Sequence, residues 1–440
     1  MEIALDFGHT LGKIKPMNAV NNGPLEPSAR QTRSNFESYK ALKIPYARNH
    51  DAAFWGAYGA EHKVDVSAIF PDFSKDPYDP ASYDFDMTDM YVHATELAGT
   101  RTFYRLGSKI EHHKKKYGTL PPPDFQKWAV ICEYIIRHYT EGWANGFHYD
   151  MQYWEIWNEP DLDPDDAENK RNWSGTLEQF VELFVISLKH LKECFPHLKI
   201  GGPGLAGVVK TKEFPDMLLS AVAKENLPLD FLSWHGYSKA VAPVVNRANR
   251  FRTLLDSYGF TETESILNEW NYVADWGDGF VDSIKDLISI KGAAFVAAVM
   301  SACQDAPVDM LMYYDARPSA FNGLFDFYTF APLKAYYAFK FFSKLADLGT
   351  QVEAAVEGED VYATAAVDAE GKAAVMITYY TFEGTENKTI SLDAKGLKNK
   401  KFSCILLDAG HDAEEVGQMD LSHGPVEITM APNTVVLLEQ

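Results

Sequence analysis

Cysteine is scarce in this chain, and the few cysteines lie far apart. Among 440 residues there are four, and no two of them form a Cys-x-x-Cys pair. Such pairs mark many zinc and redox centres, so the cysteines point to neither. Three lie in apolar stretches that are predicted to be helix or strand, where a thiol packs as a small buried hydrophobe. We interpret the four as buried, reduced thiols: Cys132, Cys194, Cys303 and Cys404.

Long hydrophobic runs are also missing. No stretch reaches about 18 uninterrupted apolar residues, the length expected of a membrane-spanning helix. Residues 1–6 lack the basic region and apolar core of a secretion signal. We therefore expect a cytoplasmic protein without membrane contacts, although a secreted chain trimmed of its signal peptide would look the same.

Positive charge is in deficit. The chain carries 41 basic against 62 acidic residues, a formal net charge of −21. This charge would repel phosphate backbones and anionic membrane surfaces, so nucleic acid is not an expected partner. Hydrophobic residues make up 46% and aromatic residues 13% of the chain, enough for a large core and for rings that stack on sugars.

The most informative stretch is Tyr153–Asp161, which reads Tyr-Trp-Glu-Ile-Trp-Asn-Glu-Pro-Asp. Its aromatic and β-branched first half predicts a short strand that is covered on both faces, and the second half has turn chemistry. Pro160 cannot donate to a strand ladder, so the strand should stop there and leave Glu159 at its C-terminal end. In a (β/α)8 barrel the catalytic groups lie at such strand ends.

A second stretch, residues 265–271, repeats this arrangement. It has an apolar strand, then Asn268 and Glu269, then the aromatic Trp270. One Asn-Glu pair alone is as typical of an ordinary polar turn as of an active site. Two such pairs at two strand ends favour a shared function.

Together these stretches resemble the acid/base and nucleophile strands of glycoside hydrolase family 39, the family of β-xylosidases and α-L-iduronidases. The resemblance extends, in order along the chain, over roughly residues 20 to 345. It implies a retaining hydrolase with its two glutamates at the ends of barrel strands four and seven. Three further segments carry it: Arg48-Asn49-His50-Asp51, Gly201-Gly202-Pro203-Gly204 and Trp234-His235-Gly236-Tyr237.

Predicted strands and helices alternate through residues 11–346, which indicates an α/β fold, a (β/α)8 TIM barrel. We expect Ile44–Ala47 to be barrel strand one and Val64–Phe70 to be another strand. The remaining predicted strands are Thr102–Leu106, Tyr153–Trp157, Lys199–Gly202, Asp230–His235, a strand ending at Glu269, and Met310–Tyr314.

Residues 347–440 have a different texture. Short alternating runs are separated by Gly, Asp and Asn turns, a pattern typical of an antiparallel β-sandwich. The strand predicted at residues 1–10 is a candidate member of the same domain. We expect this domain to pack against the barrel, with a sugar-binding module as the alternative.

Glu159 and Glu269 are the candidate catalytic residues. Hydrolysis of a glycosidic bond needs one carboxylic acid to protonate the leaving oxygen and one carboxylate to attack or to activate water. Across the mouth of a closed barrel, strands four and seven should bring the carboxyls to the ~5–5.5 Å of a retaining mechanism. We assign Glu159 as acid/base and Glu269 as nucleophile.

The resemblance also implies roles for three neighbours. Arg48 and Tyr237 would hydrogen-bond the nucleophile and hold it ionised, and Asn158 would bind the sugar 2-hydroxyl. A pocket for hydroxyls needs fixed donors and acceptors, for which His50, Asp51 and His235 are candidates. Further candidate substrate contacts are the aromatic Trp270 and, after strand eight, Tyr314, Asp315, Arg317 and Asn322.

Two other motifs do not support a different chemistry. Gly202–Gly207 fits G-x-G-x-x-G, but Pro203 removes a backbone N–H and no helix follows at once, so a dinucleotide site is not expected. Glu111-His112-His113 is followed directly by three lysines and has no third ligand at a zinc spacing. We expect neither a metal nor a cofactor.

The predicted function is removal of a terminal pentose, xylose or arabinose, from a plant-type glycan by double displacement. Arg317 could instead bind the carboxylate of a uronic acid, unless Asp315 occupies its guanidinium. Loops at 71–83 and 107–123 are long enough to close one end of a cleft, which favours exo over endo action. A carbohydrate-binding protein without turnover is the alternative from another class, and a homo-oligomer is left open.

Overall fold

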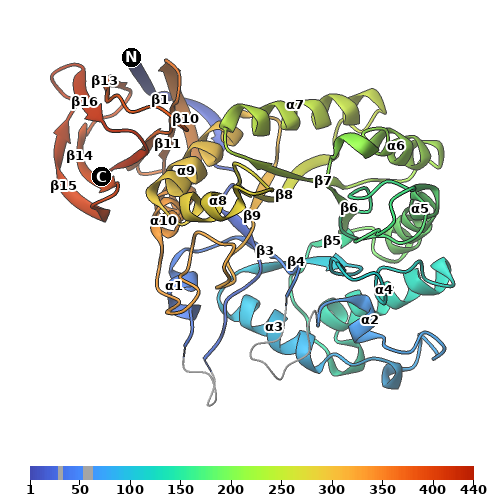
Figure 1. Cartoon of the computed structure of the whole chain (residues 1–440). Coiled ribbons are helices and arrows are strands. Elements are labelled where there is room, and N and C mark those ends of the chain that lie inside the picture. Colours follow the sequence, from blue (N-terminus) through green and yellow to red (C-terminus); the bar gives the residue numbers. More distant parts are fainter. Residues whose placement is uncertain (28–32, 53–62) are drawn as a thin grey trace.

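The computed structural model describes residues 1–27, 33–52 and 63–440. A closed barrel of eight strands fills one side of the molecule, and a nine-stranded sheet containing the C-terminus stands beside it (Figure 1). The prediction of a TIM barrel with a second, β-rich domain is confirmed.

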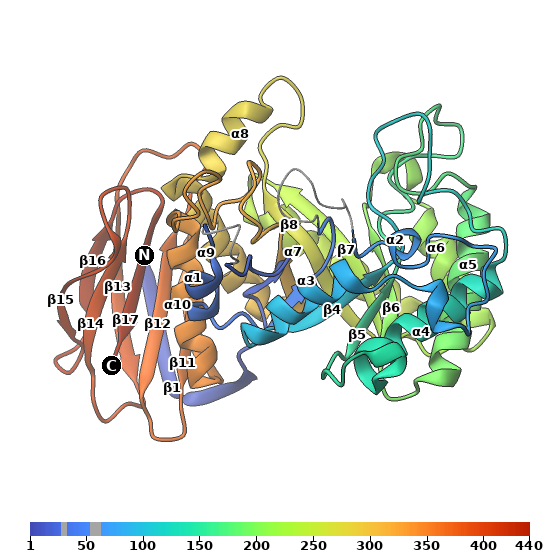
Figure 2. The same ribbon diagram turned by 90° about the horizontal axis from the view of Figure 1, so that it is seen from below.

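The barrel strands follow each other in chain order from β2 to β9, and each lies parallel to its neighbours. Helices cover the outside of the barrel, as Figure 2 shows from below. The strands are β2 Ala19–Asn21, β3 Tyr46–Arg48, β4 Arg101–Leu106, β5 Tyr153–Ile156, β6 Lys199–Leu205, β7 Phe231–Ser238, β8 Glu264–Tyr272 and β9 Met310–Tyr313.

Capping residues set the bounds of the long outer helices. Asp124 accepts a hydrogen bond from Lys127 N at the start of α4, and Gly142, with φ +76°, ends that helix. Thr176 and Gln179 form a reciprocal capping box at α5. The helices are α1 Phe36–Ala41, α2 Val66–Ile69, α3 Asp86–Leu97, α4 Phe125–Glu141, α5 Leu177–Cys194, α6 Phe214–Lys224, α7 Val241–Ser257, α8 Phe280–Leu287, α9 Ile290–Asp305 and α10 Lys334–Leu348.

Two of the predicted barrel elements were wrong. Val64–Phe70 is not a strand but contains the short helix α2, because β3 pairs directly with β4 and leaves no place between them. The first barrel strand is instead β2, within a segment that was predicted only to be extended. Arg48 therefore ends strand two, whereas Glu159 and Glu269 keep their places at strands four and seven.

The barrel interior has an apolar floor and a polar layer above it. The floor is a separate buried cluster that includes Phe103, Tyr153, Phe231 and Ile266. Because side chains alternate along a strand, Glu155 follows Tyr153 on the inside, while Trp154 and Ile156 join the core between barrel and helices. Above the floor lies a layer of fully buried polar side chains: Asn21, Arg48, Arg105, Glu155, Ser233 and Asn268.

The second domain is one mixed sheet. Its strand order is β15-β14-β17-β12-β11-β10-β1-β13-β16, and β1 lies antiparallel to β10 but parallel to β13. The N-terminal strand thus belongs to this sheet, which is not purely antiparallel. The strands are β1 Glu2–Lys13, β10 Thr350–Glu357, β11 Val361–Val367, β12 Ala373–Tyr379, β13 Lys388–Lys395, β14 Lys401–Leu407, β15 Asp412–Asp420, β16 Val426–Met430 and β17 Thr434–Glu439.

Alternation along the strands gives this sheet two buried faces. In β17, Val435 and Leu437 join the core shared with the barrel helices, whereas Val436 and Leu438 face a second core. That second core also includes Ile390, so the sheet curves over its own apolar face like a sandwich. The other face packs against α9 and α10, which fixes the domain on the barrel.

A membrane span is not evident among the described helices. No single one is long and apolar enough to cross a bilayer. Only α8 and α9 taken together, which are bent by 75° relative to each other, have the length and composition of a span.

Candidate active site

The end of β5 brings Glu159 to the barrel mouth through an unusual backbone path. Trp157 and Glu159 both have left-handed conformations, with φ of +77° and +45°. Such angles are uncommon for residues with side chains and persist where the surroundings impose them. The amide of Glu159 is held by the carbonyls of Pro203 and Gly204 at the end of β6, each 3.1 Å away.

A β-bulge in β8 brings Glu269 to the same mouth. Leu267 pairs with Trp234, but the next pair is Glu269 with His235, so Asn268 is an extra residue on its strand. A bulge of this kind reorients the side chains around it. Asn268 and Glu269 consequently both contact groups in the barrel interior.

The two glutamates face each other across one histidine. An oxygen of Glu159, an oxygen of Glu269 and a ring nitrogen of His235 all lie within 4.8 Å of one another. Nδ1 of His235 is 2.8 Å from Oε1 of Glu159 and 3.6 Å from Oε2 of Glu269. The two carboxyl groups therefore lie close enough together to act on one bound molecule.

Glu269 accepts hydrogen bonds from a charged and a neutral donor. Nη1 of Arg48 lies 3.2 Å from its Oε2, and the hydroxyl of Tyr237 donates to its Oε1 at 2.6 Å. Burial raises the pKa of Glu269, while Arg48 and Tyr237 oppose that rise. Both contacts predicted for the nucleophile are thus present.

Glu159 is surrounded mainly by uncharged groups. Its Oε2 accepts a hydrogen bond from Nδ2 of Asn172 at 3.0 Å, and its Oε1 faces His235, whose pKa is lowered by burial. Burial raises the pKa of Glu159 to about 7, against the more distant guanidinium charges of Arg48 and Arg171. At neutral pH a large fraction of Glu159 therefore retains its proton, as a general acid requires.

Arg48 organises the polar layer beneath both glutamates. Besides Glu269, its guanidinium donates to Glu155 at 2.7 Å, to Asn21 at 3.1 Å and to Asn158 at 2.5 Å. The planar guanidinium thereby links strands one, two, four and seven of the barrel.

Glu155 is a functional neighbour that sequence reasoning missed. Its second oxygen accepts hydrogen bonds from Ser233 at 2.6 Å and Asn268 at 2.5 Å, so both oxygens are engaged in a fully buried site. Its charge also balances that of Arg48. The sequence did carry a sign of its importance, because Glu155 is the single acidic residue within the apolar run Tyr153–Trp157.

Asn172 was missed as well. It lies in the irregular loop between β5 and α5, where its carbonyl accepts from the indole Nε1 of Trp157 at 2.8 Å. The same residue holds Glu159 through its side chain. No pattern in the sequence marked this position.

The backbone of the glycine-rich strand β6 lies close to the side chains of the site, and Gly204 shows this most clearly. A Cβ atom on Gly204, whose φ is +64°, would lie 3.0 Å from Nε2 of His235 and 3.2 Å from Oε1 of Glu155. Any larger residue at this position would therefore crowd the side chains of His235 and Glu155.

His50 and Asp51 lie at the end of β3, on the rim. Nδ1 of His50 accepts a hydrogen bond from Arg105 Nε at 3.2 Å, and burial lowers the pKa of His50 well below its usual value. The hydroxyl of Tyr314 donates to Asp51 Oδ2 at 3.0 Å, and a guanidinium nitrogen of Arg317 donates to the carbonyl of Asp51. These predicted sugar contacts are thus brought together from strands two and eight.

Arg317 already has an acidic partner in the chain. Its Nη2 lies 3.3 Å from Oδ2 of Asp315, a fully buried carboxyl that also accepts a hydrogen bond from Asn22 at 2.9 Å. Burial raises the pKa of Asp315 to about 7, and Arg317 opposes the rise. The Asp315 contact that was predicted to occupy Arg317 is therefore present.

Two predicted substrate contacts lie elsewhere. Trp270 follows Glu269 on the opposite side of β8 and packs, fully buried, against Phe295 of α9 and Tyr313. Asn322 is also buried, and its amide bonds the backbone of its own loop, where Oδ1 accepts from the amides of Leu324 and Phe325. Neither residue is placed to contact a sugar beside the two glutamates, so we withdraw both.

Among the described residues, two groups of side chains have the donor types of a metal site. The first is Glu159, His235 and Glu269 themselves, and the second is Glu133, His190 and Cys194 between α4 and α5. In the second group Glu133 accepts from Arg137 Nε at 2.8 Å and lies 2.7 Å from His190 Nε2. Sγ of Cys194 lies 3.8 Å from the same His190 nitrogen, so hydrogen bonding accounts for the closeness of the atoms in this second group.

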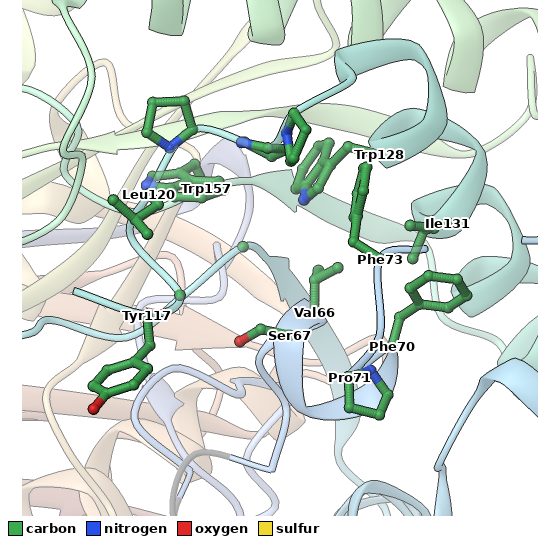
Figure 3. A pocket seen from close by; sticks show the side chains of 15 residues that line it. Val66, Ser67, Phe70, Pro71, Phe73, Tyr117, Leu120, Trp128, Ile131 and Trp157 are labelled. Carbon is green, nitrogen blue, oxygen red and sulfur yellow. The ribbon is translucent and has the colours of Figure 1, made fainter. Parts of the chain in front are cut away.

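An apolar pocket of about 260 Å³ lies beside Trp157, which follows β5 (Figure 3). Phe70, Phe73, Leu120, Trp128 and Trp157 are among the residues that line it. None of its described lining residues is charged, and its wall includes Trp157, two residues before Glu159.

A parallel eight-stranded barrel with two facing carboxylates at the C-terminal strand ends is the arrangement of barrel glycosidases. The comparison with protein families agrees with this class. Residues 73–378 match the model of glycosyl hydrolases family 39, so the chain belongs to that family.

Known relatives show how far this similarity extends. A β-xylosidase of Geobacillus stearothermophilus is 25% identical over 264 residues, which are 53% of this chain and 49% of that protein. The chain thus spans about half the length of this relative. The crystal structure of a Croceicoccus marinus glucosidase has a TM-score of 0.80 at 22% identity, covering 100% of this chain and 98% of the other. A family 39 β-xylosidase from Caulobacter crescentus has a TM-score of 0.69 at 18% identity, covering 100% and 99%.

Proposed function

We propose that this protein is a retaining glycoside hydrolase that works by double displacement. The observation that carries this proposal is the approach of the Glu159 and Glu269 oxygens to within 4.8 Å. Retaining enzymes hold their carboxyls ~5–5.5 Å apart, whereas inverting enzymes need roughly 6.5–9.5 Å to admit a water molecule.

The first step forms a bond to Glu269. Its carboxylate attacks the anomeric carbon, the glycosidic C–O bond breaks, and the leaving oxygen takes the proton of Glu159. Glu269 suits attack because Arg48 and Tyr237 favour its charged form. Glu159 suits proton donation because its pKa is raised to about 7.

The second step releases the sugar. Glu159, now a carboxylate, takes a proton from water as the water oxygen attacks the anomeric carbon, and the bond to Glu269 breaks. Esterification removes the negative charge of Glu269 during this interval, which lowers the pKa of Glu159 and suits it to act as a base.

Asn158 would bind the sugar through its side-chain nitrogen. Arg48 already donates to Oδ1 of Asn158, so Nδ2 is the atom of that amide that would donate to a sugar hydroxyl.

The substrate we favour ends in a neutral pentose, xylose or arabinose, carried on a plant-type glycan. The relative from Geobacillus stearothermophilus is a β-xylosidase, and Arg317 is paired with Asp315, which disfavours recognition of a uronic acid. A glucoside is the second candidate, because the Croceicoccus marinus protein, whose fold matches with a TM-score of 0.80, is a glucosidase.

We further propose exo action on the chain end. The loop after β4, residues 107–124, and the segment carrying α8 rise on different sides of the barrel (Figure 2). A crystal soaked with the monosaccharide product tests this proposal. A sugar enclosed beside Glu159 and Glu269 is the expected result, and an open groove running past both carboxyls would indicate an endo-acting enzyme.

Azide rescue tests the two roles separately. With an activated aryl glycoside, Glu269→Ala should be inactive until azide attacks the anomeric carbon directly and gives a glycosyl azide of inverted configuration. Glu159→Ala should still form the glycosyl-enzyme, which azide then attacks to give the retained configuration. The same configuration from both variants would contradict the assignment.

A panel of aryl glycosides tests the substrate and the main alternative. We expect aryl β-xylosides or arabinosides to be cleaved faster than glucosides and uronides. Binding of sugars without release of aglycone from any member would instead support a carbohydrate-binding protein.

A further inference from the structure

Trp276 is an exposed tryptophan at the mouth of the barrel. It lies in the segment between β8, which carries Glu269, and α8, and 60% of its surface is exposed. The other tryptophans in the described parts of the chain are buried or half-buried. Because an exposed indole leaves a large apolar area in water, covering it with a ligand would be favourable.

The segment around Trp276 is held in a fixed conformation. Both oxygens of Asp275 accept backbone amides, from Gly277 at 2.8 Å and Gly279 at 2.9 Å. The buried hydroxyl of Ser283 on α8 accepts the amides of Ala274 and Asp275 at 3.1 and 3.0 Å. The indole is thus presented on an ordered loop, which lowers the entropic cost of binding.

Neighbouring rings orient the indole. Phe280 stacks on it with a centroid distance of 5.5 Å and an interplanar angle of 13°, and Phe321 lies 6.0 Å away. Despite these two contacts, 60% of the Trp276 surface stays exposed. Apolar ring surface therefore remains for a further ring to cover.

Tyr237 connects Trp276 with Glu269, the proposed nucleophile. The rings of Tyr237 and Trp276 are nearly perpendicular, with centroids 5.0 Å apart at 78°. The hydroxyl of the same Tyr237 donates to Oε1 of Glu269 at 2.6 Å. A molecule on Trp276 would therefore adjoin the sugar that Glu269 attacks.

We propose that Trp276 is the platform of a second subsite, which stacks against the ring attached to the cleaved sugar. Its ligand is the apolar face of a pyranose or a planar aromatic aglycone, since both present C–H groups or a π-face to an indole. This inference rests on the proposed function and adds that the substrate carries a ring beyond the scissile bond.

The test compares two substrates with the same sugar but different leaving groups. One is the disaccharide, xylobiose or cellobiose as the aryl-glycoside panel selects, and the other is the corresponding glycosyl fluoride, which has no second ring. Trp276→Ala should lower kcat/KM for the disaccharide about tenfold more than for the fluoride, mainly through KM. Trp276→Phe should recover most of that ratio.

Val281→Ala is the matched control, because Val281 is 64% exposed on α8 but has no aromatic face. The control should keep the wild-type ratio. Equal losses on the disaccharide and the fluoride with Trp276→Ala, or no loss on either, would overturn the subsite.

Binding separates this proposal from the proposed function. Titration of the disaccharide into Glu269→Gln by calorimetry requires no turnover, and adding Trp276→Ala should weaken binding about tenfold. If the wild-type protein cleaves nothing, the function fails while this titration still decides the subsite. Unchanged affinity would rule the subsite out.

Discussion

Nδ1 of His235 lies 2.8 Å from Oε1 of Glu159 and 3.6 Å from Oε2 of Glu269, so one imidazole contacts both the proposed acid/base and the proposed nucleophile. Burial lowers the pKa of His235, which keeps the ring neutral and able to donate one N–H. A neutral donor favours the charged form of Glu159 less than an imidazolium would. The proton of the carboxyl pair therefore stays mainly on Glu159, because Glu269 has the charged partner Arg48.

The rate should depend on pH as a bell-shaped curve. On the acid side, activity falls as Glu269 gains a proton. This limb should lie above pH 4.5, because burial raises the pKa of Glu269 from its ordinary value of 4.5. Activity falls on the alkaline side near pH 7, as Glu159 loses the proton that the leaving oxygen needs. A pH profile of kcat/KM measures both limbs, and an alkaline limb that persists in Glu159→Gln on an activated substrate would contradict the assignment.

Tyr237→Phe should move the acid limb to higher pH. Loss of the 2.6 Å hydrogen bond removes a group that favours charged Glu269, so the pKa of Glu269 rises. Since a hydrogen bond to a charged group contributes about 1.5–3 kcal/mol, kcat/KM should fall roughly ten- to a hundredfold. Tyr272→Phe is the control, because its hydroxyl donates to Asp286, away from the site. Equal effects of the two substitutions would argue against the role of Tyr237.

Asn172→Ala should move the alkaline limb to higher pH. The amide of Asn172 donates to Oε2 of Glu159 and so favours its charged form. Without this donor the pKa of Glu159 should rise by roughly 0.5–1 unit. Asn169→Ala removes an amide of the same loop that donates to the carbonyl of His112, and should leave the profile unchanged. A downward shift in Asn172→Ala would show that the contact acts differently.

Glu159→Gln should stabilise the protein at alkaline pH. The pKa of Glu159 is raised by folding from 4.5 to about 7, so the native state holds this proton more tightly and loses relative stability as pH rises through that window. The ionised carboxylate then costs at most about 3 kcal/mol, which Gln would remove. The Tm difference between variant and wild type should be small at pH 4 and grow toward pH 8. A difference independent of pH would contradict this reasoning.

Much of the site could be predicted because its residues end strands with clear patterns. The apolar runs before Asn158-Glu159 and Asn268-Glu269 form β5 and β8, and Arg48 and Tyr237 lie where strand ends were expected. Trp270 was misjudged although strand alternation places it opposite Glu269, since an aromatic residue beside a catalytic one invites a functional interpretation.

Other features left little trace in local sequence. The first barrel strand, Ala19–Asn21, has three residues and is defined by its pairing with β3 and β9, which no local pattern reveals. Asn172 and Trp276 lie in irregular loops, where the tertiary structure decides what a side chain touches. Glu155 depends on contacts with three other strands.

The anomeric configuration of the first product tests the double displacement most directly. Proton NMR during hydrolysis by the unmodified protein, recorded before the free sugar mutarotates, distinguishes the two outcomes. With the oxygens of Glu159 and Glu269 within 4.8 Å of each other, the account predicts that the product keeps the configuration of the substrate. Release of the inverted anomer would contradict it.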